Sequence, residues 1–426
     1  MNFKEHLKRY LNNEFINELV SSLGKERTNC LLLNNNKISN EQFENDFPLI
    51  QSNKYIENSY YYNKNIYEFG KSYLFDNGAY YIQDSASMMV ANNLPLNDND
   101  LILDMCAAPG GKSIFLALKN KNIQLVSNDL SYPRALVLSS NVEKIGLGNI
   151  TVIQNDFNKN YTKFHKKFDS ILLDAPCSGS AMFRKEIEMK NDWSYDKVLR
   201  CACIQKDLLN MAYFMLKEGG YLMYSTCSFS YEEDEEVVLN FLKDHEDIKT
   251  ISIQNDPTFY HHKDLMDAVH LFPNKFKGEG QFFVLLKKDG EKLTNISINK
   301  PLKDDLSLKY SLNFNYKYNI RDQIYYSNLD INLLKNINIL RIGVYVGEIE
   351  KNIFKPSFSL AHYLPTSLSI ALSVKEKDLY LHGDSFSKDI NLPNGFYCVS
   401  YNGINLGFVK NINNTLKNFY PKGLRH

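Results

Sequence analysis

The sequence predicts an α/β protein built around a doubly wound parallel sheet, with a small α/β region before the sheet and a β-rich region after it. In the middle of the chain, short apolar strands alternate with segments of helical periodicity, which is the pattern of βαβ units. Beyond about residue 300 the chain is strand-like and rich in Tyr, Ile and Asn, with turns at LPNG and YNG. We therefore expect three regions, at residues 1–75, 76–290 and 300–426.

Length, charge and cysteine usage narrow the class of protein. The 426 residues allow two or three domains. Basic and acidic residues balance at 49 each, so any surface for nucleic acid must be local. The N-terminus MNFKEHLKRY is charged, and no apolar run approaches the ~20 residues that span a bilayer. Seven scattered cysteines suit a reducing compartment. We expect a soluble, cytoplasmic protein without a membrane partner.

The flanking regions can be assigned in outline. Residues 1–25 are amphipathic and predict one helix that stops at a glycine. A short strand at NCLLLN follows, and Ser39 begins another helix. At the other end, the chain after Asp389 has basic residues but no acidic ones. This basic tail suits either phosphate contacts or a plain solvated surface.

The segment LDMCAAPGGKS, residues 103–113, places two glycines and a proline between a predicted strand and a predicted helix. Such a loop lets backbone N–H groups and a helix N-terminus approach a charged ligand closely. It matches neither the GxxxxGK[ST] phosphate loop nor GxGxxG. Alone, the loop is therefore weak evidence for a ligand.

Three later strands of the sheet end in acids, at Asp129, Asp156 and Asp174. An acid about 20 residues after the glycine loop, the position of Asp129, typically accepts hydrogen bonds from ribose hydroxyls. Asp156 is placed to accept from an adenine amine. One strand-end acid is often only a helix cap, but three beside a glycine loop predict a nucleoside ligand. The layout suits S-adenosylmethionine, whose adenosine and cationic sulfonium are met by carboxylates.

Two cysteines follow strands whose carboxyl ends face the same crevice, Cys177 in DAPCSG and Cys227 in STCS. An isolated cysteine is more often an inert filler, and Ser230 with Glu233 matches a capping box for the next helix. Paired thiols suit one chemistry in particular. Carbon 5 of cytosine becomes nucleophilic after a thiolate adds to carbon 6, and Asp174 can bond the ring edge as charge shifts onto it.

Cys201 and Cys203 form a CxC pair that could suggest a metal site. In the helical context of CIQKDLL, however, their side chains diverge. No other Cys or His stands at zinc-site spacing from them. We therefore expect no metal.

The motifs CAAPGGK, DAPCSG and STCS, in this order, resemble those of the NOP2/Sun family of S-adenosylmethionine-dependent RNA cytosine-5 methyltransferases. YIQDSAS and HLFPNKFKGEGQFF also resemble segments of that family. RIGVYVGEIEKNIFKPSFSLA and LGFVKNINNTLKNFYPKGLR resemble the C-terminal region of the bacterial 16S ribosomal RNA methyltransferase F group. The resemblance implies a Rossmann-like class I methyltransferase fold, an RNA-binding N-terminal region, a PUA-like RNA-binding C-terminal domain and a monomer.

The resemblance also implies roles for individual residues. The family's attacking thiol falls on Cys227, and the thiol implicated in releasing the enzyme from its product falls on Cys177. The ribose-side, adenine-side and active-site acids fall on Asp129, Asp156 and Asp174. The cofactor loop falls on Cys106, Ala107, Ala108, Pro109, Gly110, Gly111 and Lys112.

Some expectations stay open at this stage. His270 stands where relatives often carry arginine, which puts an RNA contact there in doubt, and Arg134 and Lys185 are compatible with structural or RNA contacts. The expected substrate is 16S ribosomal RNA, with transfer RNA as the alternative. A DNA cytosine methyltransferase would instead attack with the cysteine of strand four. A non-catalytic ribosome-assembly factor with the same fold is the alternative from another class.

Overall fold

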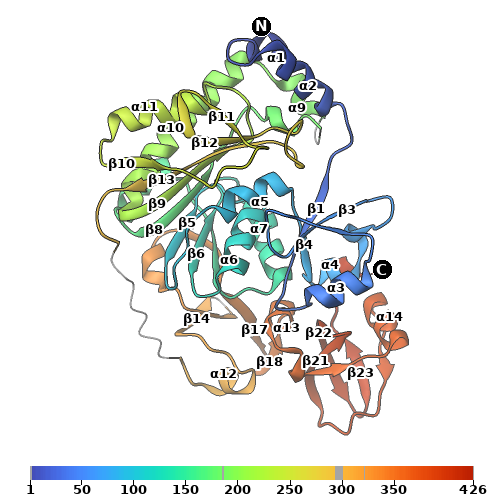
Figure 1. Cartoon of the computed structure of the whole chain (residues 1–426). Coiled ribbons are helices and arrows are strands. Elements are labelled where there is room, and N and C mark those ends of the chain that lie inside the picture. The colour runs from blue at the N-terminus through green and yellow to red at the C-terminus, as the bar shows by residue number, and fades with distance from the viewer. Residues whose placement is uncertain (1, 185–186, 293–300, 321, 426) are drawn as a thin grey trace.

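The computed structural model describes residues 2–184, 187–292, 301–320 and 322–425 (Figure 1). A ten-stranded sheet forms its centre. The strands of this sheet are β5 (Leu101–Asp104), β6 (Gln124–Asn128), β7 (Ile150–Gln154), β8 (Phe168–Asp174), β9 (Leu216–Thr226), β10 (Ile248–Ile251), β11 (Tyr260–His262), β12 (Leu265–Leu271), β13 (Gln281–Lys288) and β16 (Asn338–Ile342).

The strand order is β11-β12-β13-β9-β8-β5-β6-β7-β16, with β10 paired to β13. The five strands β7, β6, β5, β8 and β9 are parallel, and the outer strands are antiparallel to their neighbours. The chain starts the parallel part at β5 and builds outward in both directions, so the order reverses between β5 and β8. Ligands of such sheets bind beyond the carboxyl ends of the strands at this reversal. The predicted doubly wound sheet is confirmed.

Helices cover both faces of the sheet. One face packs against α5 (Ser85–Asn92), α6 (Gly111–Lys119) and α7 (Tyr132–Ile145). The other packs against α10 (Tyr195–Met215) and α11 (Glu235–Asp244). Because the strands are pleated, successive residues serve opposite faces. The first face buries Ile102, Leu125, Val152, Leu172 and Met223, and the second buries Leu103, Val126, Ile153, Leu173 and Tyr224.

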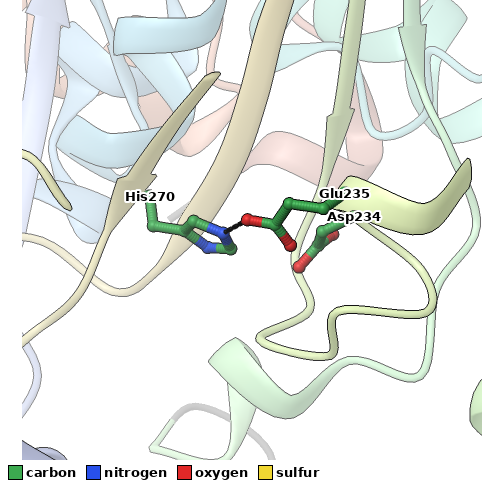
Figure 2. Close-up of side chains that lie close together, drawn as sticks. All are labelled: Asp234, Glu235 and His270. Carbon is green, nitrogen blue, oxygen red and sulfur yellow. Dashed lines mark hydrogen bonds and ion pairs between the residues drawn. The ribbon is translucent and has the colours of Figure 1, made fainter. Parts of the chain in front are cut away.

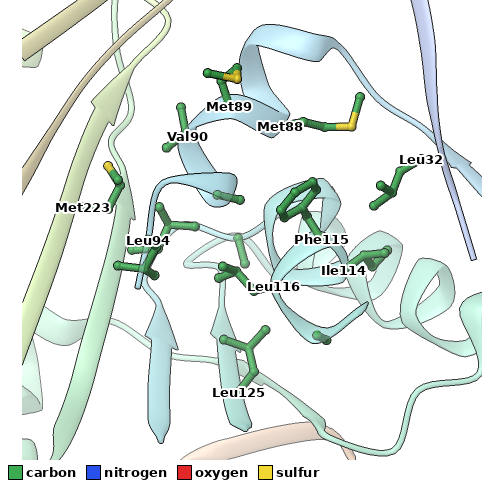
Figure 3. Packing of buried hydrophobic residues seen from close by; sticks show 14 of the residues in the cluster. Leu32, Met88, Met89, Val90, Leu94, Ile114, Phe115, Leu116, Leu125 and Met223 are labelled. Carbon is green, nitrogen blue, oxygen red and sulfur yellow. The ribbon is translucent and has the colours of Figure 1, made fainter. Parts of the chain in front are cut away.

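Figure 3 shows the first of these two cores from close by. Side chains of α5 and α6 meet over the strands, with Met223 of β9 on one side and Leu32 on the other. This packing fixes the end of α6 that carries the glycine loop. The position of the glycine loop is therefore set by a large apolar core.

The N-terminal region differs from its prediction in one element. The single helix expected in residues 1–25 is two helices, α1 (Phe3–Leu7) and α2 (Asn13–Leu23). The chain breaks because Asn12 is extended and its side chain accepts a hydrogen bond from the Phe15 N–H, which caps α2. Both helices pack on the segments that follow β8, β9 and β12, through Leu7, Leu11, Ile16, Leu19, Ala181, Phe229 and Phe272.

The remaining N-terminal elements form a small sheet. The predicted strand is β1 (Asn29–Leu33), and the predicted helix is α3 (Asn40–Asp46), with the Ser39 hydroxyl accepting from the Gln42 N–H. The sheet has the order β2-β3-β1-β4. Its other strands are β2 (Gln51–Ser52), β3 (Ser59–Tyr62) and β4 (Tyr80–Ile82), and the helix α4 (Tyr73–Asp76) precedes β4.

Two short helices of the central region are α8 (Phe157–Asn160) and α9 (Ile187–Asp192).

The C-terminal region is rich in strands, as predicted. It forms the sheets β14-β15-β17-β18 and β19-β21-β22-β23-β20. Its elements are α12 (Asp305–Lys309), β14 (Tyr316–Ile320), β15 (Gln323–Ser327), β17 (Val344–Glu350), β18 (Ile353–Pro356), α13 (Phe358–Tyr363), β19 (Ser369–Ala371), α14 (Val374–His382), β20 (Phe386–Ser387), β21 (Gly395–Tyr401), β22 (Ile404–Ile412) and β23 (Thr415–Asn418).

One strand of this region, β16, does not belong to either C-terminal sheet. It pairs antiparallel with β7, from Asn338 opposite Gln154 to Ile342 opposite Thr151, and so extends the central sheet. The region boundaries drawn from the sequence stay predictions, and residues 293–300, where the last one falls, lie outside the described residues. Within the described ranges, no helix combines the length and apolarity needed to cross a membrane.

Candidate active site

The carboxyl ends of the parallel strands open into one cavity of about 900 Å³. Every residue that the sequence nominated for the site, except Gly110, lines it. The N-terminal region also contributes to the wall, through Arg27, Thr28 and Asn29. Motifs that are far apart in the sequence therefore meet in a single space whose volume suits small-molecule ligands.

The glycine loop leaves β5 and leads into α6, and an added side chain at either glycine would require a neighbouring side chain to shift. Gly110 has φ +113°, and a Cβ there would lie 2.7 Å from Leu138 Cδ1. A Cβ on Gly111 would lie 2.8 Å from Gln83 Cδ. The loop is anchored to the next strand, since the Ala107 N–H donates to the Asn128 carbonyl (2.7 Å). Gly111 of this loop lines the cavity.

Asp129, at the end of β6, is nearly buried and tied to the glycine loop by Arg134. The carboxylate accepts from the Ser131 N–H (2.9 Å), and its Oδ2 lies 3.3 Å from Arg134 Nη2. The same Nη2 donates to the Ala108 carbonyl (2.7 Å). Arg134 thus makes a structural contact that holds Asp129 against the glycine loop.

Asp156, at the end of β7, combines a capping role with a place in the cavity wall. Its Oδ1 accepts from the Asn158 N–H (3.2 Å) at the start of α8, and Lys159 Nζ lies 3.2 Å from its Oδ2. Hydrogen bonding to Asn158 lowers its pKa below the usual value. The carboxylate is therefore ionised at neutral pH, as an acceptor for a nucleoside amine should be.

A further acid, Asp104 at the end of β5, was missed by the sequence reasoning. It is completely buried and lines the cavity, and its Oδ2 accepts from the Ser113 hydroxyl (2.7 Å). Within the described part of the chain its Oδ1 has no hydrogen-bond partner. Burial raises its pKa to about 7. The signal was present in the segment LDMC, where Asp104 ends its strand as the other three acids end theirs.

Asp174, at the end of β8, gathers donors from three elements. Its Oδ2 accepts from Lys112 Nζ (2.7 Å), and its Oδ1 accepts from the Ser225 hydroxyl (2.7 Å) and from Gln281 Nε2 (3.0 Å). Charge-assisted bonds of this kind fix a carboxylate firmly. The sequence reasoning did not anticipate Ser225 or Gln281 as partners.

The two thiols lie side by side. The Cys227 N–H donates to Cys177 Sγ (3.3 Å), and the Ala181 N–H donates to the Cys227 carbonyl (3.0 Å). Both cysteines are half-buried and line the cavity with Asp174. Hydrogen bonding to Cys227 and burial raise the pKa of the Cys177 thiol well above its usual value. The raised pKa favours the protonated form of the Cys177 thiol.

Comparisons with known proteins agree with this geometry. A family model described as 16S rRNA methyltransferase RsmB/F matches residues 91–287. Ribosomal RNA small subunit methyltransferase F of Aliivibrio salmonicida is 30% identical over 378 residues, covering 82% of this chain and 79% of that protein. The protein of that name from Shewanella loihica is 30% identical over 384 residues, covering 82% of this chain and 78% of its own length. The chain belongs to the RsmF family.

Three other family models match the flanking regions. They are the N-terminal domain of 16S rRNA methyltransferase RsmF at residues 1–85, the RsmF rRNA methyltransferase first C-terminal domain at residues 305–364, and the methyltransferase RsmF PUA domain at residues 367–426. As a member of the RsmF family, the chain is an S-adenosylmethionine-dependent RNA methyltransferase. The predicted family, enzyme class and cofactor are confirmed.

Solved structures support the fold. NSun6 from Pyrococcus horikoshii with SFG has a TM-score of 0.60 and 20% identity, covering 68% of this chain and 98% of that one. A methyltransferase homolog protein from the same organism has a TM-score of 0.58 and 24% identity, covering 67% of this chain and 93% of that one. Both likenesses confirm the Rossmann-like methyltransferase fold.

One prediction about this RsmF-family site is wrong. Ser230 and Glu233 do not form a capping box, because α11 begins at Glu235 and has no side-chain cap. Among the described residues, the Ser230 hydroxyl has no partner. Glu233 points inward and accepts hydrogen bonds from Ser178 and Ser228. Interior donors, which the S-x-x-E spacing does not record, attract the carboxylate more than the helix end does.

Beside this segment lies a buried cluster of Asp234, Glu235 and His270 (Figure 2). In the described part of the chain it is the group whose donor atoms, within 4.8 Å of one another, could hold a metal ion. His270 Nε2 already bonds to Glu235 Oε1 at 2.6 Å, and burial raises the pKa of Asp234 well above its usual value. His270 is thus a buried, interior partner of Glu235.

Several sequence candidates lie away from the cavity of this RsmF-family chain. Cys201 and Cys203 lie on α10, half-buried and exposed respectively, and neither is part of the described cavity wall. Lys185 lies outside the described residues. The basic tail belongs to the last C-terminal sheet and the segment after it.

Proposed function

We propose that this chain methylates carbon 5 of a cytosine in 16S ribosomal RNA through a covalent bond between Cys227 and the ring. The observation that carries the proposal is the pair of adjacent thiols, Cys177 and Cys227, beside Asp174 in the cavity that also holds the glycine loop. A nucleophilic amine or oxygen needs no thiol to accept a methyl group. Carbon 5 of cytosine does, because the ring must first be made electron-rich.

The residues of the cavity fit S-adenosylmethionine. Gly111 and the start of α6 line the cavity, and the acids at the ends of β5, β6 and β7 would face the nucleoside and the cation of the cofactor. When bound, S-adenosylmethionine supplies an electrophilic methyl group. We assign the ribose side to Asp129 and the adenine side to Asp156.

The chain's own residues would act as follows. The Cys227 thiolate adds to carbon 6, and the electron pair of the ring double bond makes carbon 5 nucleophilic. Asp174 bonds the ring edge, held in place by Lys112, Ser225 and Gln281. After methylation, water in the cavity takes the proton from carbon 5. Its bonding electrons restore the double bond, and the Cys227 thiolate departs. Cys177, protonated and next to Cys227, assists this release.

Cysteine variants test the assignment. Cys227→Ala should abolish methyl transfer, because no thiolate then activates the ring. Cys177→Ala should still attack but release slowly, so a covalent enzyme–RNA adduct should accumulate as a band that survives denaturing electrophoresis. If formation of the adduct instead required Cys177, the two roles would be reversed.

Sequencing tests the substrate. The relatives named above are ribosomal RNA small subunit methyltransferases, which supports 16S ribosomal RNA as the substrate here. Bisulfite sequencing of a deletion strain should show loss of 5-methylcytosine from that RNA. Loss from transfer RNA alone would contradict the assignment, and an absence of cofactor binding by calorimetry would favour a non-catalytic assembly factor.

We also propose that the enzyme acts as a monomer in the cytoplasm. The monomer is what the resemblance to the family implies, and a reducing compartment keeps both thiols free. Light scattering of the purified protein, alone and with cofactor, checks the oligomeric state.

A further inference from the structure

A single buried carboxylate connects the two cysteine loops. Glu233 is completely buried and accepts four hydrogen bonds. Its Oε1 accepts from the Ser178 N–H (2.8 Å) and from Gln205 Nε2 (3.0 Å). Its Oε2 accepts from the hydroxyls of Ser178 (2.5 Å) and Ser228 (2.6 Å). Ser178 directly follows Cys177 and Ser228 directly follows Cys227, so this carboxylate binds the residue after each thiol.

The same network also holds the residue before Cys177. Gln205 Nε2 donates to the Pro176 carbonyl (2.9 Å) as well as to Glu233. Gln205 lies on α10 and is completely buried. The Cys177 loop is therefore tied on both sides of the thiol, and both ties lead to Glu233.

The Cys227 loop is held on both sides in the same way. The Thr226 hydroxyl, just before Cys227, donates to Asp234 Oδ1 (2.5 Å), and the Ser228 N–H donates to Thr226 Oγ1 (3.1 Å). The Tyr224 hydroxyl donates to the Glu233 carbonyl (2.7 Å), which fixes the backbone of the acidic segment to β9. The two acids thus set the position of the Cys227 backbone relative to the sheet.

Burying a carboxylate is costly, and an apolar contact could join two loops more cheaply. A carboxylate does something that an apolar contact cannot, since its two oxygens accept from several donors in fixed directions. Here those donors come from both cysteine loops. Burial raises the pKa of Glu233, while the hydrogen bonds from Ser178, Ser228 and Gln205 oppose that shift.

We propose that Glu233 is a positioning residue of the methyl-transfer reaction, which fixes the attacking thiol of Cys227 and the releasing thiol of Cys177 at their working separation. The proposal rests on the two-thiol reaction proposed above. Glu233 does not line the cavity, so it acts through Ser178 and Ser228 and not by touching a substrate. Misplacement of a reacting group by about 1 Å can cost ~10²-fold in rate.

The test uses the full-length chain in a Cys177→Ala background, where adduct accumulates and its rate of formation reports attack by Cys227 alone. Adding Glu233→Ala should slow adduct formation about 10²-fold. The dissociation constant for S-adenosylmethionine, measured by calorimetry, should stay within about twofold, because the glycine loop and Asp129 are untouched. Glu236→Ala is the matched control, since Glu236 is an exposed acid on the first turn of α11.

A graded series separates positioning from a general loss of fold. In Glu233→Gln the amide oxygen can still accept from the Ser178 N–H and Gln205, and the amide nitrogen can donate to the two hydroxyls. We expect this variant to recover the rate to within about tenfold of the parent. The double variant Ser178→Ala with Ser228→Ala should slow attack as Glu233→Ala does, and it carries the test if Glu233→Ala does not fold.

The outcomes are distinguishable. Absence of adduct in Cys177→Ala alone would overturn the two-thiol reaction itself. Normal adduct in that background, formed at an unchanged rate after Glu233→Ala, would overturn only the role of Glu233. A rate that falls no more than the folded fraction measured by circular dichroism would overturn it equally.

Discussion

Asp104 is the cavity residue whose ionisation depends most clearly on the fold. Burial raises its pKa from 3.8 to about 7. Between these values the folded chain holds a proton that the unfolded chain has lost. The stabilisation is therefore fully present below pH ~4 and is lost as the pH rises through about 7.

Asp104→Asn removes this titration and should flatten the pH dependence of stability. We expect the free energy of unfolding of the parent, relative to that of the variant, to fall by about 2–4 kcal/mol between pH 4 and 7.5. Urea unfolding across this range measures the difference, with the exposed Asp305→Asn as control. Parallel curves for parent and Asp104→Asn would contradict the burial argument.

At the scale of residues, the sequence predicts the residues of the site better than the residues that hold them in place. Asp129, Asp156, Asp174 and both cysteines stand in short motifs at strand ends, and the structure places them together. Gln281 reaches Asp174 from a position 107 residues away, so no local pattern marks it. Hydrogen-bond partners of this kind depend on which distant residues the fold brings together.

In the turn between β5 and α6, the backbone conformation restricts which residue can occupy position 110. Gly110 combines φ +113° with a close approach to Leu138. Gly110→Ala should lower the free energy of unfolding by about 1–3 kcal/mol through backbone strain. It should also weaken S-adenosylmethionine binding, because the loop must move away from α7. Urea unfolding and titration calorimetry measure the two effects.

Gly403→Ala is a matched control for this turn. Gly403 also has a positive φ, +74°, but an added Cβ there would meet no atom within 4 Å. It should show the strain without the change in cofactor affinity. An unchanged affinity in Gly110→Ala would mean that close packing at α7 does not shape the binding loop.

Helix ends were predicted less well than helices, for a physical reason. The apolar positions Leu7, Leu11, Ile16 and Leu19 read as one continuous face, yet Asn12 splits it by capping a second helix. A side chain with a polar tip can satisfy a helix end or a distant donor, and sequence spacing alone does not decide between them. The alternation of strands and helices is predicted correctly despite such local errors, because it follows from the apolar residues that form the core.

At the scale of the whole molecule, the C-terminal region is locked into the central sheet by β16 and its side chain Arg341. Arg341 Nη2 lies 3.1 Å from Glu143 Oε2 on α7, and its Nη1 donates to the Ser359 hydroxyl (3.0 Å) on α13. The pairing of β16 with β7 could not be predicted. It joins segments far apart in sequence, and an edge strand has no pattern that names its partner.

Arg341→Met should destabilise the whole chain, because it leaves Glu143 beside a buried apolar side chain. Since Glu143 is partly exposed, we expect a loss of about 2–4 kcal/mol, below that of a fully buried pair. Urea unfolding followed by tryptophan fluorescence and circular dichroism measures it, with the exposed Lys335→Met as control. Equal midpoints for Arg341→Met and the parent would show that Arg341 adds nothing to what holds the regions together.

The balanced charge of the chain means that RNA must be attracted by local surfaces, and the basic tail is the candidate that the sequence singled out. Lys417, on β23, and Lys422 are exposed and have no acidic residue nearby in sequence. Each phosphate contact steepens the dependence of log affinity on log salt concentration by roughly 0.7–0.9.

Lys417→Gln with Lys422→Gln should therefore weaken binding of 16S ribosomal RNA and reduce that slope by about 1–2. The rate of methyl transfer at saturating RNA should be unchanged, because neither lysine lines the described cavity. Filter binding between about 50 and 200 mM salt measures the slope, with Lys121→Gln and Lys303→Gln as an equally charged control. An identical slope for both double variants and the parent would assign the tail to plain solvated surface and leave RNA attraction to the other regions.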